Sequence, residues 1–600
     1  MSKRVADFIA DFIYSKLSVK HVFMVTGAGI MHLTDGVASH GKLQTICPHH
    51  EQTSSMAIDA YSRATENIGV GFFTSGPGGT NAITGLGGAW QDSVPCLFIS
   101  GQVKKKETTN DAKIPGLRQF GVQELDLIPI VKSLCKYAVN LDDPKKVKYE
   151  FEKATHIAKS GRPGPVWIQI PMDVQSATID ENELEGFSTN EQIPTPKDEE
   201  IKSIVELLKK SSRPVIISGQ GIRISGAISI LEEFSSKFKI PVVTPFLGID
   251  TMRHDLHEYV GKTGVKGDRA ANFAMQNSDL IIAIGTSMHV TVTGYTYEHF
   301  ARKAKKIVVD IDQISHKKNT IKIDQFVLSD AKKFLEKIQK FIENEKIKEF
   351  SEWAEQCNRW KKKYPVCLPE YKKIKGKLNS YVLIDTLCKY SKENDIFVSD
   401  AGGTYYATSQ AIQLTKKGQR YIPSSAMATM GYSLPAAIGI SVAINKKRVL
   451  ALTGDGSFQQ NLQELQTVIE YNLPIKLFVL NNEGYESIRT SQKNYFEKRF
   501  LGEGNQSGLS FPDTEKIAKA YGIKFIRISE YGEVDGKIKD ILSFNGPVIC
   551  EVMVPSDQQI IPTVSSRVNP DGTMSSRPLE DMYPFLDRDE YRSNLFIDEV

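Results

Sequence analysis

Short apolar runs rich in β-branched residues recur along the whole chain, and they constrain its fold more than any other feature. Most runs end in Gly, Pro, Asn or Asp, and the stretches between them have helical spacing. Because the runs are continuously apolar, we expect strands buried on both faces, as in parallel sheets covered by helices. The fold class is therefore α/β, with doubly wound parallel sheets. The runs are residues 21–27, 68–76, 96–101, 166–171, 214–219, 241–245, 280–285, 306–312, 396–400, 448–456, 475–482 and 547–554.

Two polar stretches divide the chain into three consecutive α/β units. Residues 176–200 are acidic and poor in apolar residues, which is typical of a linker, and residues 342–380 are rich in lysine. A length of 600 residues is also too great for one core. We therefore expect an N-terminal domain at 1–180, a central domain at 195–345 and a C-terminal domain at 375–560. A tail or lid is expected at 561–600.

The charge and cysteine content exclude several classes of protein. The net charge is only +4 over 600 residues, which favours neither a nucleic-acid nor a membrane-surface partner. No apolar run approaches the roughly 18 residues of a membrane span, and residues 1–17 lack the unbroken apolar stretch of a signal peptide. The seven cysteines include no C-x-x-C pair, which indicates reduced thiols. We therefore expect a cytoplasmic protein.

The segment 453–485 carries the clearest candidate site. Gly454, Asp455 and Gly456 end one apolar run, a helix is expected next, and the following run ends at Asn482. Because the carboxyl ends of adjacent parallel strands meet at one edge of a sheet, Asp455 and Asn482 can converge there. Such hard oxygen donors suit Mg²⁺, and the backbone N–H groups after Gly456 suit the phosphates that this ion bridges. A Gly-Asp-Gly turn alone, however, is common at strand ends.

Taken whole, this segment resembles the diphosphate-binding motif of thiamine diphosphate enzymes. Residues 49–103 are similar to the pyrimidine-binding domain of the acetolactate synthase family, and residues 424–438 resemble the glycine- and methionine-bearing turn of that family. The resemblance covers most of the chain and is strongest in the first and third domains. It implies a pyrimidine-binding domain, a central domain and a diphosphate-binding domain, in that order.

The resemblance also implies roles for single residues. Glu51 would hydrogen-bond the cofactor pyrimidine and relay a proton, although a Glu outside this context is more often solvated or capping. Met430 would hold the cofactor bent, the alternative being core filling, and Gln123 would lie near the reacting carbonyl. The metal would be held by Asp455, Asn482 and the carbonyl of Gly484. The remaining cofactor contacts would come from Gly402, Gly403, Thr404, Gly454, Gly456 and Ser457.

The expected acceptor pocket departs from the family. Acetolactate synthases of amino-acid pathways carry a tryptophan nine positions after the metal-binding Asn, where this chain has Ser491. A smaller, polar residue leaves room for a larger or more hydrophilic acceptor. Tyr485 and Arg489 are expected near this pocket, with Gly27 from the first domain. Arg489 could bind a carboxylate or phosphate, or be a plain surface residue.

A second departure is the tail. Residues 557–591 resemble tails of acetolactate synthase-like proteins associated with surface polysaccharide and modified-sugar pathways. Together with Ser491, this suggests a keto-sugar nucleotide as the acceptor, while pyruvate stays open as the other candidate.

The central domain poses the question of a flavin. Residues 219–226 and the strand carrying Asp310 and Asp312 resemble flavin-contacting segments of relatives, which implies FAD as a cofactor. Where those relatives have a stretch rich in Arg and Asp, this chain has GTSMHVTVTG at 285–294, and several polar contacts to a flavin would be lost. The alternative is a central domain that holds no ligand.

The two parts of the expected active site, at Glu51 and at Asp455, lie far apart in the sequence. Glu51 and Asp455 lie in different domains, and in relatives the pyrimidine rests on one subunit and the diphosphate on its neighbour. The resemblance therefore implies a homodimer or homotetramer with the active site at the subunit interface.

The expected reaction is the decarboxylation of pyruvate, dependent on thiamine diphosphate and Mg²⁺, with transfer of the acetyl unit to a carbonyl acceptor. One alternative is a 2-keto acid decarboxylase or flavin-coupled oxidase without carboligation. Another is a catalytically silent assembly subunit, although such a chain has no need of Glu51, Asp455 and Asn482 together.

Overall fold

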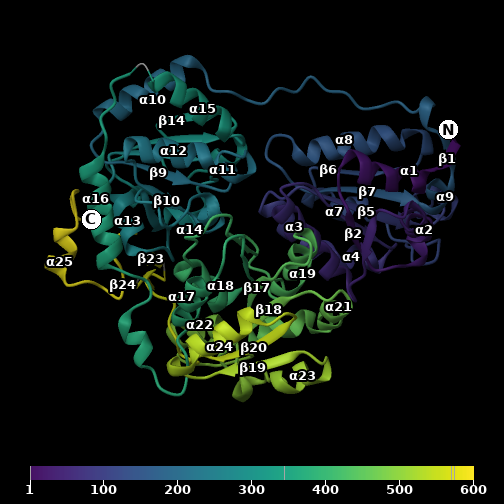
Figure 1. The fold of residues 1–600 in the computed structure, drawn as a ribbon. Helices are drawn as coiled ribbons and strands as arrows, with labels where there is room; N and C mark the ends of the chain where they lie inside the picture. Colours follow the sequence, from purple (N-terminus) through teal and green to yellow (C-terminus); the bar gives the residue numbers. More distant parts are fainter. Residues whose placement is uncertain (1, 344, 569, 573) are drawn as a thin grey trace.

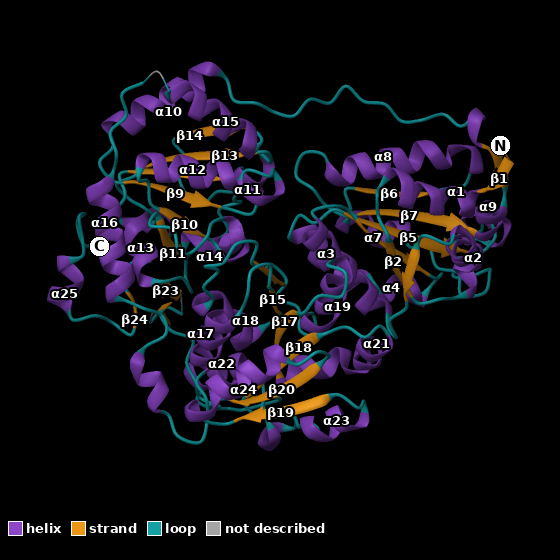
Figure 2. Ribbon diagram, viewed as in Figure 1, coloured by secondary structure: helices purple, strands orange, loops and turns teal. Residues whose placement is uncertain are grey.

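The computed structural model describes residues 2–343, 345–568, 570–572 and 574–600. Three six-stranded sheets form the centres of three α/β domains, and every pair of neighbouring strands within them is parallel. Figure 1 follows the chain from the first domain through the central to the third, and Figure 2 shows the sheets between their helices. The expected α/β class with parallel sheets is confirmed.

The first sheet has the order β3-β2-β4-β5-β7-β6. Its strands are β2 (His21–Met24), β3 (Gln44–Ile46), β4 (Gly69–Phe73), β5 (Cys96–Gln102), β6 (Tyr137–Asn140) and β7 (Val166–Pro171), and a small antiparallel pair joins β1 (Ser2–Arg4) to β8 (Thr178–Asp180). The helices are α1 (Val5–Asp11), α2 (Met31–His40), α3 (Glu51–Thr65), α4 (Pro77–Asn81), α5 (Ile83–Gln91), α6 (Thr109–Ala112), α7 (Ile128–Val131), α8 (Val147–Lys159) and α9 (Met172–Ser176).

The central sheet has the order β11-β10-β9-β12-β13-β14. Its strands are β9 (Pro214–Ser218), β10 (Val242–Thr244), β11 (Tyr259–Lys262), β12 (Leu280–Ile284), β13 (Lys305–Asp310) and β14 (Gln325–Leu328). The helices are α10 (Asp198–Lys210), α11 (Gly221–Ile224), α12 (Ile228–Phe238), α13 (Arg269–Gln276), α14 (Val290–Thr293), α15 (Ala331–Ile342) and α16 (Ser351–Lys363).

The third sheet has the order β16-β15-β17-β18-β20-β19. Its strands are β15 (Ile396–Ser399), β16 (Arg420–Pro423), β17 (Val449–Gly454), β18 (Ile475–Asn481), β19 (Lys524–Ile528) and β20 (Val548–Met553). The helices are α17 (Ser380–Tyr390), α18 (Gly402–Ala411), α19 (Ser433–Ala443), α20 (Asp455–Phe458), α21 (Leu465–Glu470), α22 (Glu486–Tyr495), α23 (Thr514–Ala520) and α24 (Tyr531–Ser543).

The first and third sheets share one strand order. Numbered along each domain, both run 2-1-3-4-6-5, whereas the central sheet runs 3-2-1-4-5-6. Ligands bind such sheets outside the carboxyl ends of the strands at which the order reverses. In the third domain this point lies between β15 and β17, and in the central domain between β9 and β12.

The connections between domains differ in kind. Residues 184–197 cross from the first to the central domain without helix or strand, along the top of Figure 1. The lysine-rich stretch after the central sheet contains α16, which packs against α13 and so extends the central domain.

The last forty residues return to the central domain. They contain the short strands β21 (Thr563–Val564), β22 (Ser566–Val568), β23 (Met574–Ser576) and β24 (Met582–Tyr583), and the helix α25 (Arg588–Ser593). The side chains of Val564, Leu579, Met582 and Tyr591 join the apolar core of the central domain. This segment, expected as a tail or lid, is therefore an ordered part of that domain's packing.

The first and third domains meet along two helices. α3 packs on α19, and their apolar residues belong to one continuous core. Gly439 allows the close approach, because a Cβ there would stand 2.2 Å from the carbonyl oxygen of Ala57. Glu51 is the first residue of α3, so this contact places it against the third domain. Within the described ranges, no helix is both long and apolar enough to span a membrane.

Candidate active site

Asp455 and Asn482 meet at the carboxyl edge of the third sheet, as the sequence predicts. β17 and β18 are neighbours, with Gly454 opposite Leu480, so the residues that follow these strands lie side by side. Asp455 Oδ1 accepts from the N–H of Gly456 (2.8 Å), and Oδ2 accepts from the N–H of Gly484 (3.1 Å). The loop after β18 is thereby held over the end of β17.

The donor atoms at this edge fit a divalent cation. Asn482 Oδ1 is buried and has no hydrogen-bond partner among the described residues, which is costly for a polar atom unless a ligand satisfies it. Burial raises the pKa of Asp455 to about 6, against the lowering effect of four backbone N–H groups. A carboxylate, an amide oxygen and a backbone carbonyl are the oxygen ligands that Mg²⁺ prefers. Asp455, Asn482 and Gly484 could therefore hold it.

The glycines after β15 lie beside this site. Gly402 has a φ of +58° and begins α18, a ten-residue helix whose first N–H groups face the carboxyl edge of the sheet. Thr404 Oγ1 lies 3.5 Å from where a Cβ of Gly454 would stand, so the two strand ends are in contact. This arrangement suits an anion such as a diphosphate.

Two buried carboxylates at this edge are missing from the sequence prediction. Asp400 accepts from Thr453 Oγ1 (2.7 Å), which ties β15 to β17, and burial raises its pKa to about 6. Glu486 begins α22 beside Gly403, accepts from Thr490 Oγ1 (2.9 Å), and has its pKa raised by burial. The signal for Asp400 was its position directly after an apolar run, the same signal that identified Asp455.

The turn that carries Met430 is fixed by the residues after Asp455. Ser457 Oγ accepts from the N–H of Gly431 (2.9 Å), so this hydroxyl, predicted to contact a cofactor, orients the Met430 turn. Met430 is half-buried, with its Sδ 3.7 Å from the side-chain amide of Gln460. The turn therefore lies directly next to the residues that follow Asp455. We call residues 482–484, which follow β18, the metal loop.

Glu51 stands at the N-terminus of α3, where His50 is the capping residue. Asn81 Nδ2 donates to Glu51 Oε2 (2.9 Å), and Glu51 Oε1 lies 3.4 Å from where a Cβ of Gly78 would stand. The carboxylate is half-buried and is oriented by another side chain, so it is neither a cap nor a freely solvated group.

Two further predicted residues lie at the carboxyl edge of the first sheet. Gly27 follows β2 and packs against Thr74, which follows the neighbouring strand β4. Gln123 is exposed, with a φ of +61°, and its carbonyl approaches Gly76, just before α4. Since α4 also carries Asn81, Gln123 and Glu51 are on the same side of this domain.

Asn461 links the Met430 turn to the N-terminal end of α3, which carries Glu51, within one chain. Its side-chain amide donates to the carbonyl of Gly431 (2.9 Å) and to the side chain of Gln52 (3.2 Å), and its Oδ1 accepts from Thr53 (3.2 Å). The residue after Met430 is thus joined to the residue after Glu51.

A buried ionic cluster makes a second connection between these domains. Arg63 on α3 donates to Asp92 (2.7 Å) and to Asp59 (3.3 Å). Asp92 also accepts from the backbone N–H groups of Ser425 (3.2 Å) and of residue 426 (3.0 Å), and Tyr432 donates to Asp59 (2.5 Å). We call these four side chains, Asp59, Arg63, Asp92 and Tyr432, the interdomain cluster. It flanks the Met430 turn on both sides.

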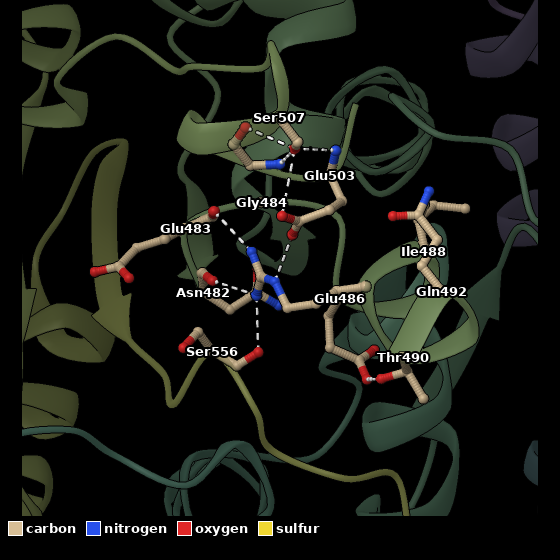
Figure 3. A network of polar contacts seen from close by, with 12 residues as sticks. Asn482, Glu483, Gly484, Glu486, Ile488, Thr490, Gln492, Glu503, Ser507 and Ser556 are labelled. Atoms are coloured by element: carbon tan, nitrogen blue, oxygen red, sulfur yellow. Dashed lines mark hydrogen bonds and ion pairs between the residues drawn. The ribbon is translucent and has the colours of Figure 1, made fainter. Parts of the chain in front are cut away.

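Three of the residues expected near the acceptor lie in the third domain, and two of them, Tyr485 and Arg489, are engaged with the residues around the metal site. The ring of Tyr485 packs onto Gly456, where a Cβ would stand 2.1 Å from it. Arg489 donates to Glu503 and to backbone carbonyls around the metal loop (Figure 3). Ser491 lies on α22 and donates to the carbonyl of Ile488 one turn earlier (2.9 Å).

The flavin-like segments of the central domain are engaged within the chain. Arg223 donates to Asp250 (3.0 Å) at the junction of the three domains. Asp312 accepts from Arg162 of the first domain (3.1 Å). Residues 285–294 form the turn after β12 and the short helix α14. Arg223 and Asp312 are thus paired with residues outside the flavin-like segments, and we assign no step to a flavin.

Comparison with known protein families agrees with this architecture. Residues 3–129 match the "Thiamine pyrophosphate enzyme, N-terminal TPP binding domain", residues 201–338 the central domain, and residues 400–552 the "C-terminal TPP binding domain". Each match falls within a different one of the three domains, although the first ends before β6 and the last begins just after β15.

Similar proteins extend over nearly the whole chain. An acetolactate synthase large subunit of Cyanidium caldarium is 31% identical over 92% of this chain and 93% of its own length. A probable acetolactate synthase large subunit of Methanocaldococcus jannaschii is 32% identical over 89% of each chain. An acetolactate synthase large subunit of Lactococcus lactis subsp. lactis is 30% identical over 93% of each chain.

Proposed function

This chain belongs to the acetolactate synthase family of thiamine diphosphate enzymes, and from that premise we propose that it decarboxylates pyruvate and transfers the acetyl unit to a carbonyl acceptor. We propose further that Mg²⁺ holds the cofactor diphosphate at the carboxyl edge of the third sheet. One observation carries the proposal: Asn482 presents a buried amide oxygen that has no partner among the described residues, in the loop whose backbone N–H groups bind the Asp455 carboxylate. A silent assembly subunit has no reason to retain so costly an arrangement.

The chain's own residues divide the work of binding and proton transfer. Thiamine diphosphate, when bound, supplies the stabilisation of negative charge that decarboxylation requires. Asp455, Asn482 and Gly484 would hold the metal, and the N–H groups at the start of α18 would bind diphosphate oxygens. Asn81 orients the Glu51 carboxylate, which would exchange a proton with the cofactor's pyrimidine at Oε1.

Two acceptors have separate support. The names of the relatives favour a second molecule of pyruvate, which would give acetolactate. Ser491, small and polar on α22, and the resemblance of the tail favour a keto-sugar nucleotide. Arg489 supports neither acceptor, because its guanidinium is engaged around the metal loop.

Product analysis tests the function and separates the acceptors. Purified protein is given pyruvate, thiamine diphosphate and Mg²⁺, with and without keto-sugar nucleotides, and the products are identified by mass spectrometry. Acetolactate from pyruvate alone identifies pyruvate as acceptor, and a sugar nucleotide heavier by one acetyl unit identifies the larger one. Acetaldehyde or acetate as the sole product contradicts carboligation.

We propose that the active enzyme is at least a homodimer with its sites between subunits. Large apolar side chains are exposed next to both parts of the expected active site, a pattern typical of protein interfaces. Val122 is 83% exposed beside Gln123, and Leu501 is 77% exposed beyond α22. Phe120, Phe496 and Phe500 are exposed in the same segments, and Met427 is exposed in the turn that carries Met430.

Subunit mixing distinguishes sites between subunits from sites within one chain. Glu51→Gln and Asp455→Ala chains are each expected to be inactive, and they are co-expressed with different affinity tags. A heterodimer then has one site with both native residues if the sites lie between subunits, and none if each site lies within a chain. Random pairing yields heterodimers as half of all dimers, so about a quarter of wild-type activity is expected in the mixture. An inactive purified heterodimer contradicts the proposal that the active sites lie between subunits.

The cysteines support the expected compartment. All seven are unpaired, as in proteins of reducing compartments, and we propose a cytoplasmic location on that basis.

A further inference from the structure

Through its side chain, Arg489 contacts the loop that follows β18. It belongs to the first turn of α22, where long side chains point back towards the N-terminus of their helix. Its Nη1 donates to the carbonyls of Asn482 (3.1 Å) and Ser556 (2.8 Å), and its Nη2 to that of Glu483 (2.9 Å). Figure 3 shows these acceptors gathered from two separate segments. One guanidinium thus fixes two successive carbonyls of the metal loop.

The guanidinium is itself held by a buried carboxylate. Arg489 Nε donates to Glu503 Oε2 (2.5 Å), and only 20% of the Arg side chain and 9% of the Glu side chain are exposed. Ser507 Oγ lies 3.3 Å from the other carboxylate oxygen and accepts from the N–H of Glu503 (2.9 Å). Because the pair is largely desolvated and supported by a third residue, the orientation of the guanidinium is well defined.

The backbone of Glu503 also contacts the segment that follows the metal loop. The carbonyl of Glu503 accepts from the N–H of Tyr485 (2.8 Å). Between them, Gly484 has a φ of +148°, and a Cβ there would stand 2.0 Å from Glu503 O and 2.5 Å from Arg489 Nη2. The backbone of Gly484 is therefore enclosed by Arg489 and Glu503, and its conformation depends on both.

We propose that Arg489 is a positioning residue for the metal loop, and that Glu503 is its anchor. By fixing the carbonyls of Asn482 and Glu483, the Arg489–Glu503 pair sets the direction in which Asn482 Oδ1 and the Gly484 carbonyl face Asp455. Its effect is on the affinity for Mg²⁺ and diphosphate, not on the acceptor. This inference rests on the proposed function, since it concerns the proposed metal ligands.

The central test measures binding without turnover. Thiamine diphosphate is titrated into metal-free protein at several Mg²⁺ concentrations and followed by calorimetry, for wild type, Arg489→Gln and Arg489→Lys. Loss of groups that orient metal ligands typically lowers metal affinity by about 10- to 100-fold, and we expect that loss in Arg489→Gln. Arg489→Lys is expected to recover only part of it, because an ammonium cannot reproduce the planar set of donors.

A matched control comes from the same segment. Arg499 forms an ion pair with Glu497 that is exposed at both ends, and Arg499→Gln is expected to bind Mg²⁺ and cofactor as wild type does. At saturating Mg²⁺ and cofactor, Arg489→Gln should recover most of the wild-type kcat, with an unchanged KM for pyruvate. A loss of activity caused only by damage to the fold would not be reversed by raising the Mg²⁺ concentration.

Hydrogen exchange supplies an independent readout. In metal-free Arg489→Gln, the amides of residues 483–485 should exchange at least about tenfold faster than in wild type, while those of the central domain stay unchanged. If Arg489→Gln does not fold, Glu503→Gln keeps the shape of the anchor and is expected to weaken Mg²⁺ affinity in the same direction.

The outcomes separate this inference from the proposed function. Wild-type protein that binds thiamine diphosphate independently of Mg²⁺, or not at all, contradicts the proposed function. Wild type that binds as proposed while Arg489→Gln, or Glu503→Gln in its place, binds equally well contradicts only the positioning role.

Discussion

The interdomain cluster makes a strong prediction, because Asp92 serves two connections at once. Its carboxylate is 2% exposed. It pairs with Arg63 and accepts two backbone N–H groups from the segment that leads to Met430. Asp92→Ala therefore leaves the Arg63 guanidinium with Asp59 as its remaining carboxylate, and frees residues 425–426 from the first domain.

The size of the effect follows from the burial of the pair. Breaking a buried ion pair by removing one partner costs about 3–5 kcal/mol. A cavity of about 10 Å³ adjoins the cluster, and with the space vacated by the carboxylate it could admit a water to replace part of the lost hydrogen bonding. We therefore take the lower end, about 3 kcal/mol, as the fall in the local free energy of opening. This corresponds to an acceleration of amide exchange of more than about 100-fold.

Hydrogen exchange followed by mass spectrometry measures this locally, which matters in a chain of three domains that need not unfold together. Peptides covering 424–432 and 56–63 should exchange faster in Asp92→Ala, while β12 in the central domain should not change. Glu497→Gln, in an exposed ion pair, is the control. An Asp92→Ala protein whose residues 424–432 exchange within about threefold of wild type refutes the cluster as the support of the Met430 turn.

Four further predictions concern the site. Glu51→Gln should abolish turnover and the exchange of the cofactor C2 proton, measured by NMR, without changing thermal unfolding; unchanged turnover rules out the proton role. Because burial raises the Asp400 pKa to about 6, above its ordinary value of 3.8, the folded state favours the protonated form, and the free energy of unfolding falls as pH rises between these values. Asp400→Asn should lack this fall, so its stability relative to wild type should rise by on the order of 3 kcal/mol between pH 4 and pH 7; parallel pH profiles contradict it. Ser491→Trp should lower the yield of any acetylated sugar nucleotide relative to acetolactate, and an unchanged product ratio argues against Ser491 as a determinant of the acceptor. Added FAD should leave kcat unchanged, because Arg223 and Asp312 of the flavin-like segments are already paired within the chain. A rise in kcat on addition of FAD would contradict this prediction.

Whether the sequence predicts a strand of the three large sheets depends on the position of that strand in its sheet. All twelve apolar runs are inner strands of the three sheets. The strands that it did not reveal are β3, β6, β11, β14, β16 and β19, and each is the edge of its sheet. An edge strand pairs on one side only, so its composition is less apolar: β6 is half-buried throughout, and Lys524 and Arg527 of β19 are exposed.

The candidate site was predictable to the extent that it depends on strand ends. Asp455 and Asn482 converge because a parallel sheet brings successive strand ends to one edge, and Asp400 follows the same rule. The role of Arg489 could not be predicted, because most of its partners are backbone carbonyls, which any residue type supplies. Ser457 was expected at the cofactor, and its contact with Gly431 depends on a turn that no sequence pattern specifies.

The docking of the last forty residues onto the central domain gives the chain an unusual order of assembly. Domains form as they leave the ribosome, beginning at the N-terminus. The central core, however, includes Val564, Leu579, Met582 and Tyr591, which are translated only after the whole third domain. The apolar face of the central domain that these residues cover therefore stays exposed until the third domain and the segment after it have been synthesised. Translation that stops short of residue 564 leaves that face open to chaperones and proteases.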